Sequence, residues 1–104
     1  MKVEHWDAER DGSLTEEALR RKLEKLGYRV TRYTYPPGTY FPFHTHSVDK
    51  LDAVLSGQFR IGIRGESALL QAGDFVSVPA NIEHETEVVG SEPIISLDAV
   101  KITL

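Results

Sequence analysis

Cysteine is absent from this sequence of 104 residues. The absence excludes disulfides, thiolate nucleophiles and cysteine-ligated zinc or iron–sulfur sites. The remaining side chains that bind metals strongly are His, Asp and Glu. Any metal ion is therefore expected to be held by nitrogen and oxygen.

Excess basic charge and long apolar runs are also lacking. Twelve Lys and Arg against sixteen Asp and Glu give a formal net charge of −4, so we expect no nucleic-acid partner. No apolar run approaches the roughly 20 residues of a membrane span, and residues 1–11 are polar where a signal peptide carries an apolar stretch. We expect a cytoplasmic protein with no membrane partner.

The length and the 40% hydrophobic content suit a single domain with one core. Residues 1–27 are expected to form an N-terminal segment whose amphipathic helix, over residues 13–27, packs on the body of the domain. Ser13 or Thr15 can cap this helix, and Gly27 can end it. Its apolar stripe recurs at three- and four-residue spacing and consists of Ala18, Leu19, Leu23 and Leu26.

From residue 28 onward, short runs of β-branched and aromatic residues alternate with turn residues, which predicts an all-β sandwich or barrel over residues 28–104. The alternation of residues 59–63 gives one strand an inner face of Phe59, Ile61 and Ile63. The expected strands are residues 28–35, 40–46, 51–55, 59–63, 68–70, 75–78, 84–89 and 94–104.

Three histidines are candidates for a mononuclear metal site. His44 and His46 lie two residues apart, so on a strand they share one face and can reach one ion. His84 would have to reach the same ion from a distant strand. His5 has no companion of ligand type at useful spacing, and we interpret it as a surface residue.

The spacing around these histidines resembles the two motifs of the cupin family over residues 38–88. The first motif consists here of Gly38, His44, His46, Lys50 and Gly57, and the second of Gly73, Pro79, Asn81 and His84. The resemblance implies an all-β double-stranded β-helix (jelly-roll-like) barrel with one N-terminal helix. It also implies a divalent metal ion (Fe, Ni, Mn, Cu or Zn) held in the barrel mouth by His44, His46 and His84.

Three positions depart from the cupin pattern. Lys50 stands where the family usually has a glutamate ligand, Asn81 replaces a frequent glycine, and Val88 replaces a frequent asparagine. Asn81 is a mild change because asparagine tolerates the left-handed conformation. Lys50 is not mild, since a cation at this place would repel a metal ion, by about 4 kcal/mol for unit charges 4 Å apart at an effective dielectric of 20.

Three interpretations of Lys50 remain open. In the first, Lys50 points out of the metal site, and Asp49 or Asp52 either pairs with it or takes over as the carboxylate ligand. Asp52 is two residues from Lys50, so on a strand the two side chains share a face. In the second, three histidines and a water or substrate complete the site while Lys50 attracts an anionic ligand. In the third, no metal binds and the cavity takes an organic anion. Asp98 is a further candidate for the cavity wall.

The resemblance implies dioxygenase-like or isomerase-like chemistry on a small organic acid, with Lys50 binding the substrate anion or transferring a proton. The alternative function is a non-catalytic module that binds or senses a small molecule, either without metal or with a vestigial site.

We expect a homodimer that covers the exposed sheet edges.

The side chains near the histidines have simpler interpretations. Aromatic rings near the first motif are expected to fill the core or a subunit interface, with the lining of a substrate pocket as the alternative; they are Tyr33, Tyr35, Tyr40, Phe41 and Phe43. Glu83, Glu85 and Glu87 are expected on a solvated face, and Phe43 and Thr45 are expected to face away from the histidines.

Overall fold

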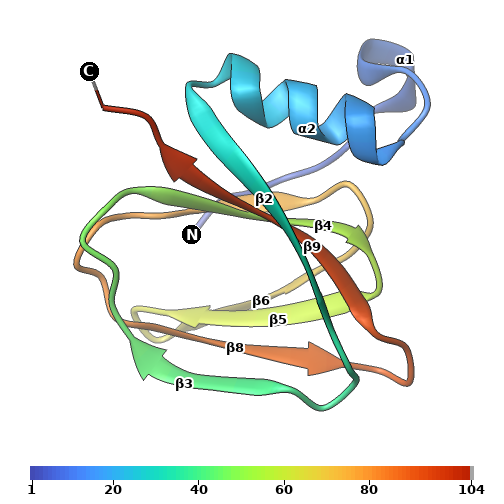
Figure 1. The fold of residues 1–104 in the computed structure, drawn as a ribbon. Helices are drawn as coiled ribbons and strands as arrows, with labels where there is room; N and C mark the ends of the chain where they lie inside the picture. The colour runs from blue at the N-terminus through green and yellow to red at the C-terminus, as the bar shows by residue number, and fades with distance from the viewer. Residues whose placement is uncertain (104) are drawn as a thin grey trace.

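The computed structural model describes residues 1–103 and consists of two antiparallel sheets that face each other, with helix α2 on the outside of one of them (Figure 1). The five-stranded sheet has the order β1-β7-β4-β9-β2, and the four-stranded sheet has the order β3-β8-β5-β6. The elements are β1 (Val3–Glu4), α1 (Ala8–Asp11), α2 (Glu16–Lys25), β2 (Tyr28–Tyr35), β3 (Tyr40–His44), β4 (Lys50–Ser56), β5 (Gln58–Ile63), β6 (Glu66–Leu70), β7 (Phe75–Val78), β8 (His84–Val89) and β9 (Ile94–Lys101).

All eight predicted strands are present, with shifted ends in several cases. The strands over residues 28–35, 75–78 and 84–89 have the predicted bounds. The strand predicted over residues 40–46 ends at His44, and the one predicted over residues 94–104 ends at Lys101; Leu104 lies outside the described residues. The short elements β1 and α1 were not predicted, because two- and four-residue segments carry no hydrophobic period.

Helix α2 confirms the predicted amphipathic helix in a shorter form. Thr15, rather than Ser13, is the N-cap, and its Oγ1 accepts a hydrogen bond from the Ala18 amide at 3.0 Å. Leu19 and Leu23 are fully buried, whereas Leu26 is half exposed and lies beyond the helix. The buried pair packs on the outer face of the five-stranded sheet, against a cluster that includes Leu51, Ala53, Leu97 and Ala99.

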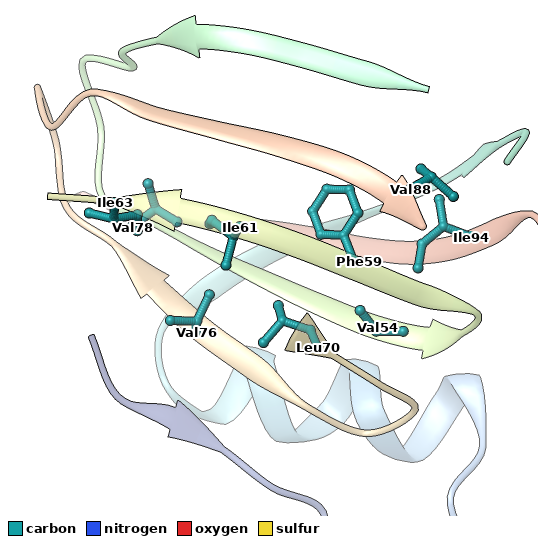
Figure 2. Close-up of a cluster of buried hydrophobic side chains, with 9 residues drawn as sticks. All are labelled: Val54, Phe59, Ile61, Ile63, Leu70, Val76, Val78, Val88 and Ile94. Carbon is teal, nitrogen blue, oxygen red and sulfur yellow. The ribbon is translucent and has the colours of Figure 1, made fainter. Parts of the chain in front are cut away.

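The main core lies between the two sheets. The predicted inner face of β5 is confirmed, since Phe59, Ile61 and Ile63 are all buried there. Figure 2 shows this cluster, which consists of Val54, Phe59, Ile61, Ile63, Leu70, Val76, Val78, Val88 and Ile94.

Strand alternation turns a set of charged residues toward the interior of the barrel. On β4, Leu51 and Ala53 pack on the helix side, so Lys50 and Asp52 lie on the same inner face as Val54. On β9, Leu97 and Ala99 face the helix, which leaves Asp98 on the inner face. One end of the interior is therefore polar, and the strands β3 and β8 of the opposite sheet face it.

None of the helices in residues 1–103 is long and apolar enough to cross a membrane.

Gly57 provides a test of this packing. Its φ is +90°, and a Cβ atom there would lie 2.5 Å from the Pro93 carbonyl oxygen. Gly65 has a φ of +76° but open space around the position of its Cβ. We expect Gly65→Ala to lower the free energy of unfolding by about 1 kcal/mol through backbone strain alone. Gly57→Ala should cost about 1–3 kcal/mol more because of the clash. Urea denaturation of both variants measures this difference, and equal losses would contradict the packing described at Gly57.

Candidate metal centre

The three predicted histidines converge at the polar end of the barrel. His44 ends β3, His46 lies in the loop that follows, and His84 begins β8 as the register partner of His44. One ring nitrogen from each histidine lies within 4.8 Å of the others. The ring centroids are 4.2–5.1 Å apart. Within residues 1–103, this is the one group of three His, Asp or Glu residues close enough to hold an ion.

Hydrogen bonds orient two of the imidazole rings. Nδ1 of His44 lies 2.7 Å from the Pro42 carbonyl oxygen, and Nδ1 of His84 lies 3.0 Å from the Ile82 carbonyl oxygen. A carbonyl only accepts hydrogen bonds, so both Nδ1 atoms are assigned as the donors. Nε2 of each ring then carries the free lone pair. Metal-binding histidines are commonly fixed in this way by a partner on the other nitrogen.

The local environment lowers the pKa of two of the histidines and so favours their neutral form. Burial, and then the charge of Lys50, lower the pKa of His46. Burial is also the main cause that lowers the pKa of His84, which is 2% exposed. A neutral imidazole is the form that binds a metal ion, so these shifts extend the pH range in which the site is competent.

A β-bulge shapes the wall that carries His44. On β3, Phe41 pairs with Thr86 of β8 and His44 pairs with His84, so three steps along β3 match two along β8. The extra residue brings Phe41 and His44 to the same cavity, although strict alternation would place them on opposite faces. Sequence periodicity gave no signal for this bulge.

Lys50 and Asp98 form an ion pair on the opposite wall. Lys50 Nζ lies 2.8 Å from Asp98 Oδ1 and 2.9 Å from Oδ2, and the Lys50 side chain is only 12% exposed. The angles satisfy a hydrogen bond to Oδ2 alone, so Oδ1 is in ionic contact without one. The charge of Lys50 is thus balanced by a carboxylate, as in the first interpretation, but the partner is Asp98 rather than Asp49 or Asp52.

Asp52 lies beside this pair and is the register partner of Asp98 across β4 and β9. Burial, and then the charge of Asp98, raise the pKa of Asp52 to about 6. Asp52 lines the cavity but is not part of the histidine group. Asp49 lies elsewhere, because it is exposed and its Oδ1 accepts a hydrogen bond from the Ala80 amide at 2.8 Å.

The cavity between the two walls has a volume of about 180 Å³. This is below the roughly 300–1,000 Å³ of sites for drug-sized molecules, so the cavity suits a smaller ligand. A second hollow of about 440 Å³ lies at the opposite end of the barrel, but none of the histidines lines it. The first cavity is lined by the three histidines, Lys50, Asp52 and Asp98, together with Tyr33, Tyr35, Phe41, Ala53, Phe59, Thr86, Ser96 and Leu97.

The model of the cupin domain family matches residues 31–100 of this chain. The chain belongs to the cupin family. No curated protein sequence matches it at a significant level.

Solved structures share this cupin fold. A protein of unknown function, SPY1581 from Streptococcus pyogenes, is 25% identical with a TM-score of 0.65, over 75% of this chain and 68% of that protein. The DMSP lyase DddQ from Ruegeria pomeroyi is also 25% identical with a TM-score of 0.65, but this chain covers only 40% of its length. A predicted oxalate decarboxylase from Thermotoga maritima is 20% identical with a TM-score of 0.65, over 80% of this chain and 74% of that protein, and shows the fold alone.

The second cupin motif has a defined local structure here. Asn81 adopts a φ of +62°, in the left-handed region that glycine also reaches, and its amide donates to the His46 carbonyl oxygen at 2.7 Å. The substitution by asparagine therefore keeps the turn. This hydrogen bond ties the loop that carries His46 to the segment before His84.

The aromatic residues near the first cupin motif divide into two groups. Tyr33, Tyr35 and Phe41 line the cavity, which was the alternative interpretation of these rings, and Tyr35 also packs against the main core as predicted. On β2, Tyr28 and Val30 pack on the helix side, so Tyr33 and Tyr35 lie on the cavity side by alternation, and the β-bulge of β3 brings Phe41 there. Tyr40 and Phe43 are exposed on the outside, so Phe43 faces away from the histidines as predicted.

The remaining predictions concern the surface. Glu83 is exposed as predicted, whereas Glu85 and Glu87 are partly buried and pair with Arg60 at 2.6 and 3.4 Å on the outer face of the four-stranded sheet. His5 is a surface histidine as predicted, although its Nδ1 lies 2.8 Å from Asp74 Oδ1.

The raised pKa of Asp52 implies that the free energy of unfolding depends on pH. Below its unfolded pKa of 3.8, Asp52 is protonated in both states and costs nothing. As the pH rises through the folded pKa of about 6, ionisation favours the unfolded state and stability is lost. We therefore expect metal-free Asp52→Asn to exceed the wild type in unfolding free energy by about 1–3 kcal/mol at neutral pH.

Urea denaturation from about pH 4 to pH 7 measures this effect, and the advantage of Asp52→Asn should shrink as the pH falls. Asp49→Asn is the matched control, since this carboxylate is exposed outside the cavity. An advantage that does not depend on pH would contradict the assigned environment of Asp52.

Proposed function

We propose that this cupin binds one divalent metal ion through His44, His46 and His84 and that a small organic acid binds beside the ion in the cavity. The observation that carries the proposal is the convergence of three imidazoles, two of which have Nε2 free because carbonyl groups occupy Nδ1. Imidazole ligands suit zinc, copper, iron and nickel, whereas manganese prefers oxygen ligands. Three neutral ligands leave coordination positions for water or a substrate.

The bound ion would supply a Lewis acid that polarises an oxygen atom of the ligand. The protein supplies the rest of the site. Lys50, paired with Asp98, can donate a hydrogen bond to an oxygen atom of the ligand. Tyr33, Tyr35 and Phe41 line one side of the cavity.

Asp52 favours isomerase-like chemistry over dioxygenase-like chemistry. An isomerisation needs a group that accepts and returns a proton, and such a group works best with a pKa near the working pH. Asp52 meets this requirement, because its pKa is raised to about 6 and its carboxylate lines the cavity. Oxygen uptake by the iron(II)-loaded protein with small organic acids would instead support dioxygenase-like chemistry.

A non-catalytic module that binds a small molecule is the second candidate. The observation in its favour is the Lys50–Asp98 ion pair, which removes Lys50 as a free acid or base. Such a module would show ligand-dependent shifts of the melting temperature without turnover. The homodimer and the cytoplasmic location stay predictions.

The metal content of the purified protein tests the proposal. We expect elemental mass spectrometry to find close to one equivalent of a transition metal per chain. Replacement of His44, His46 and His84 by alanine should remove it, because the carboxylates nearby do not join the histidine group. His5→Ala is the control, since His5 lies outside the group. Metal that persists in the triple variant would contradict the proposal.

A further inference from the structure

The cavity has two facing walls of different chemistry. The histidine wall comes from β3, β8 and the loop after β3, and these strands belong to the four-stranded sheet. The facing wall comes from β4 and β9 of the five-stranded sheet and carries Lys50, Asp52 and Asp98. A ligand that reaches the histidines with one end therefore meets two carboxylates and one ammonium group with the other.

The ammonium group of Lys50 pairs with Asp98 and not with Asp52. Lys50 Nζ lies within 2.9 Å of both oxygens of Asp98. Asp52 makes no hydrogen bond or ion pair that the structure records within residues 1–103. A carboxylate in a partly buried position without a donor is unfavourable, and a ligand that supplies a donor removes this cost.

We infer that the ligand carries a hydrogen-bond donor, an ammonium or a hydroxyl group, at the end away from the histidines, and that this donor pairs with Asp52. The inference rests on the proposed function, since it takes the acid group of the ligand to lie at the histidine wall. It narrows the ligand from any small organic acid to one with a second, donating group.

The aromatic side of the cavity is compatible with a positively charged donor. Tyr33 and Tyr35 stack with ring centroids 5.9 Å apart, and Phe41 meets Tyr35 edge to face at 5.0 Å. Aromatic rings attract cations through their quadrupoles. A ligand with an ammonium group would therefore bind in this cavity more tightly than one with a hydroxyl group.

The test uses three probes that share a carboxylate and a four-carbon spacing but differ at the far end: 4-aminobutyrate, 4-hydroxybutyrate and pentanoate. Binding to the metal-loaded protein is measured by calorimetry at pH 8, where Asp52 is ionised. We expect 4-aminobutyrate to bind about tenfold more tightly than pentanoate, as one charge-assisted hydrogen bond would give.

Asp52→Asn keeps the size of the side chain and removes its charge. We expect this variant to lose most of the preference for 4-aminobutyrate, and Asp49→Asn to keep it, because Asp49 lies outside the cavity lining. A preference shared by 4-hydroxybutyrate identifies a general donor site, and one confined to 4-aminobutyrate identifies a site for a cation. Equal binding of pentanoate, an unchanged preference in Asp52→Asn, or no binding of any probe would overturn the inference.

Metal content measured on the same samples separates the two proposals. A stoichiometric metal ion with no donor preference overturns the inference alone. If no metal is retained, the proposed function fails, and the Asp52 wall is tested in the metal-free protein with butylammonium and 1-butanol. Butylammonium or 1-butanol should then raise the melting temperature of the wild type more than that of Asp52→Asn. For both probes, equal shifts in the two proteins would overturn the inference.

Discussion

The antiparallel pairing of β3 with β8 is the constraint on which the candidate site depends. It sets His84 directly opposite His44, and the bulge between Phe41 and His44 turns both His44 and an aromatic ring into the cavity. The hydrogen bond from Asn81 to the His46 carbonyl oxygen holds the third histidine close to the other two. The Pro42 and Ile82 carbonyl groups then fix which nitrogen of His44 and His84 is free. The backbone therefore arranges the donor atoms.

The five-stranded sheet supplies the second half of the site, and its apolar packing makes this possible. Because Leu51, Ala53, Leu97 and Ala99 pack toward α2, the alternate residues of β4 and β9 must face the interior. Charged side chains at those positions are stable there only if they are paired or open to the cavity. Lys50 and Asp98 satisfy the first condition, and Asp52 satisfies the second. The replacement of the usual cupin glutamate by Lys50 is thus accommodated by Asp98.

Much of the fold could be predicted from the sequence because its signals are local. Pro36, Pro37 and Pro79 end strands, and the alternation of Phe59, Ile61 and Ile63 defines an inner face. The histidine set followed from the spacing of the two cupin motifs. The partner of Lys50 could not be predicted, because Asp98 lies 48 residues away and only the register of β4 with β9 brings the two together. The inward turn of Phe41 was missed because a bulge leaves no mark on hydrophobic periodicity.

The proposed function depends most on the binding of one metal ion by three imidazoles. X-ray absorption spectroscopy of the metal-loaded protein tests this claim directly, because it counts the histidine ligands and measures their distances. We expect three imidazole nitrogens at about 2.0–2.1 Å if the ion is zinc, with any further ligands being light oxygen atoms. A spectrum with fewer than three imidazoles, or one dominated by carboxylate ligands, would contradict the three-histidine site. The ion would then lie near Asp52 on the facing wall of the cavity or at the surface.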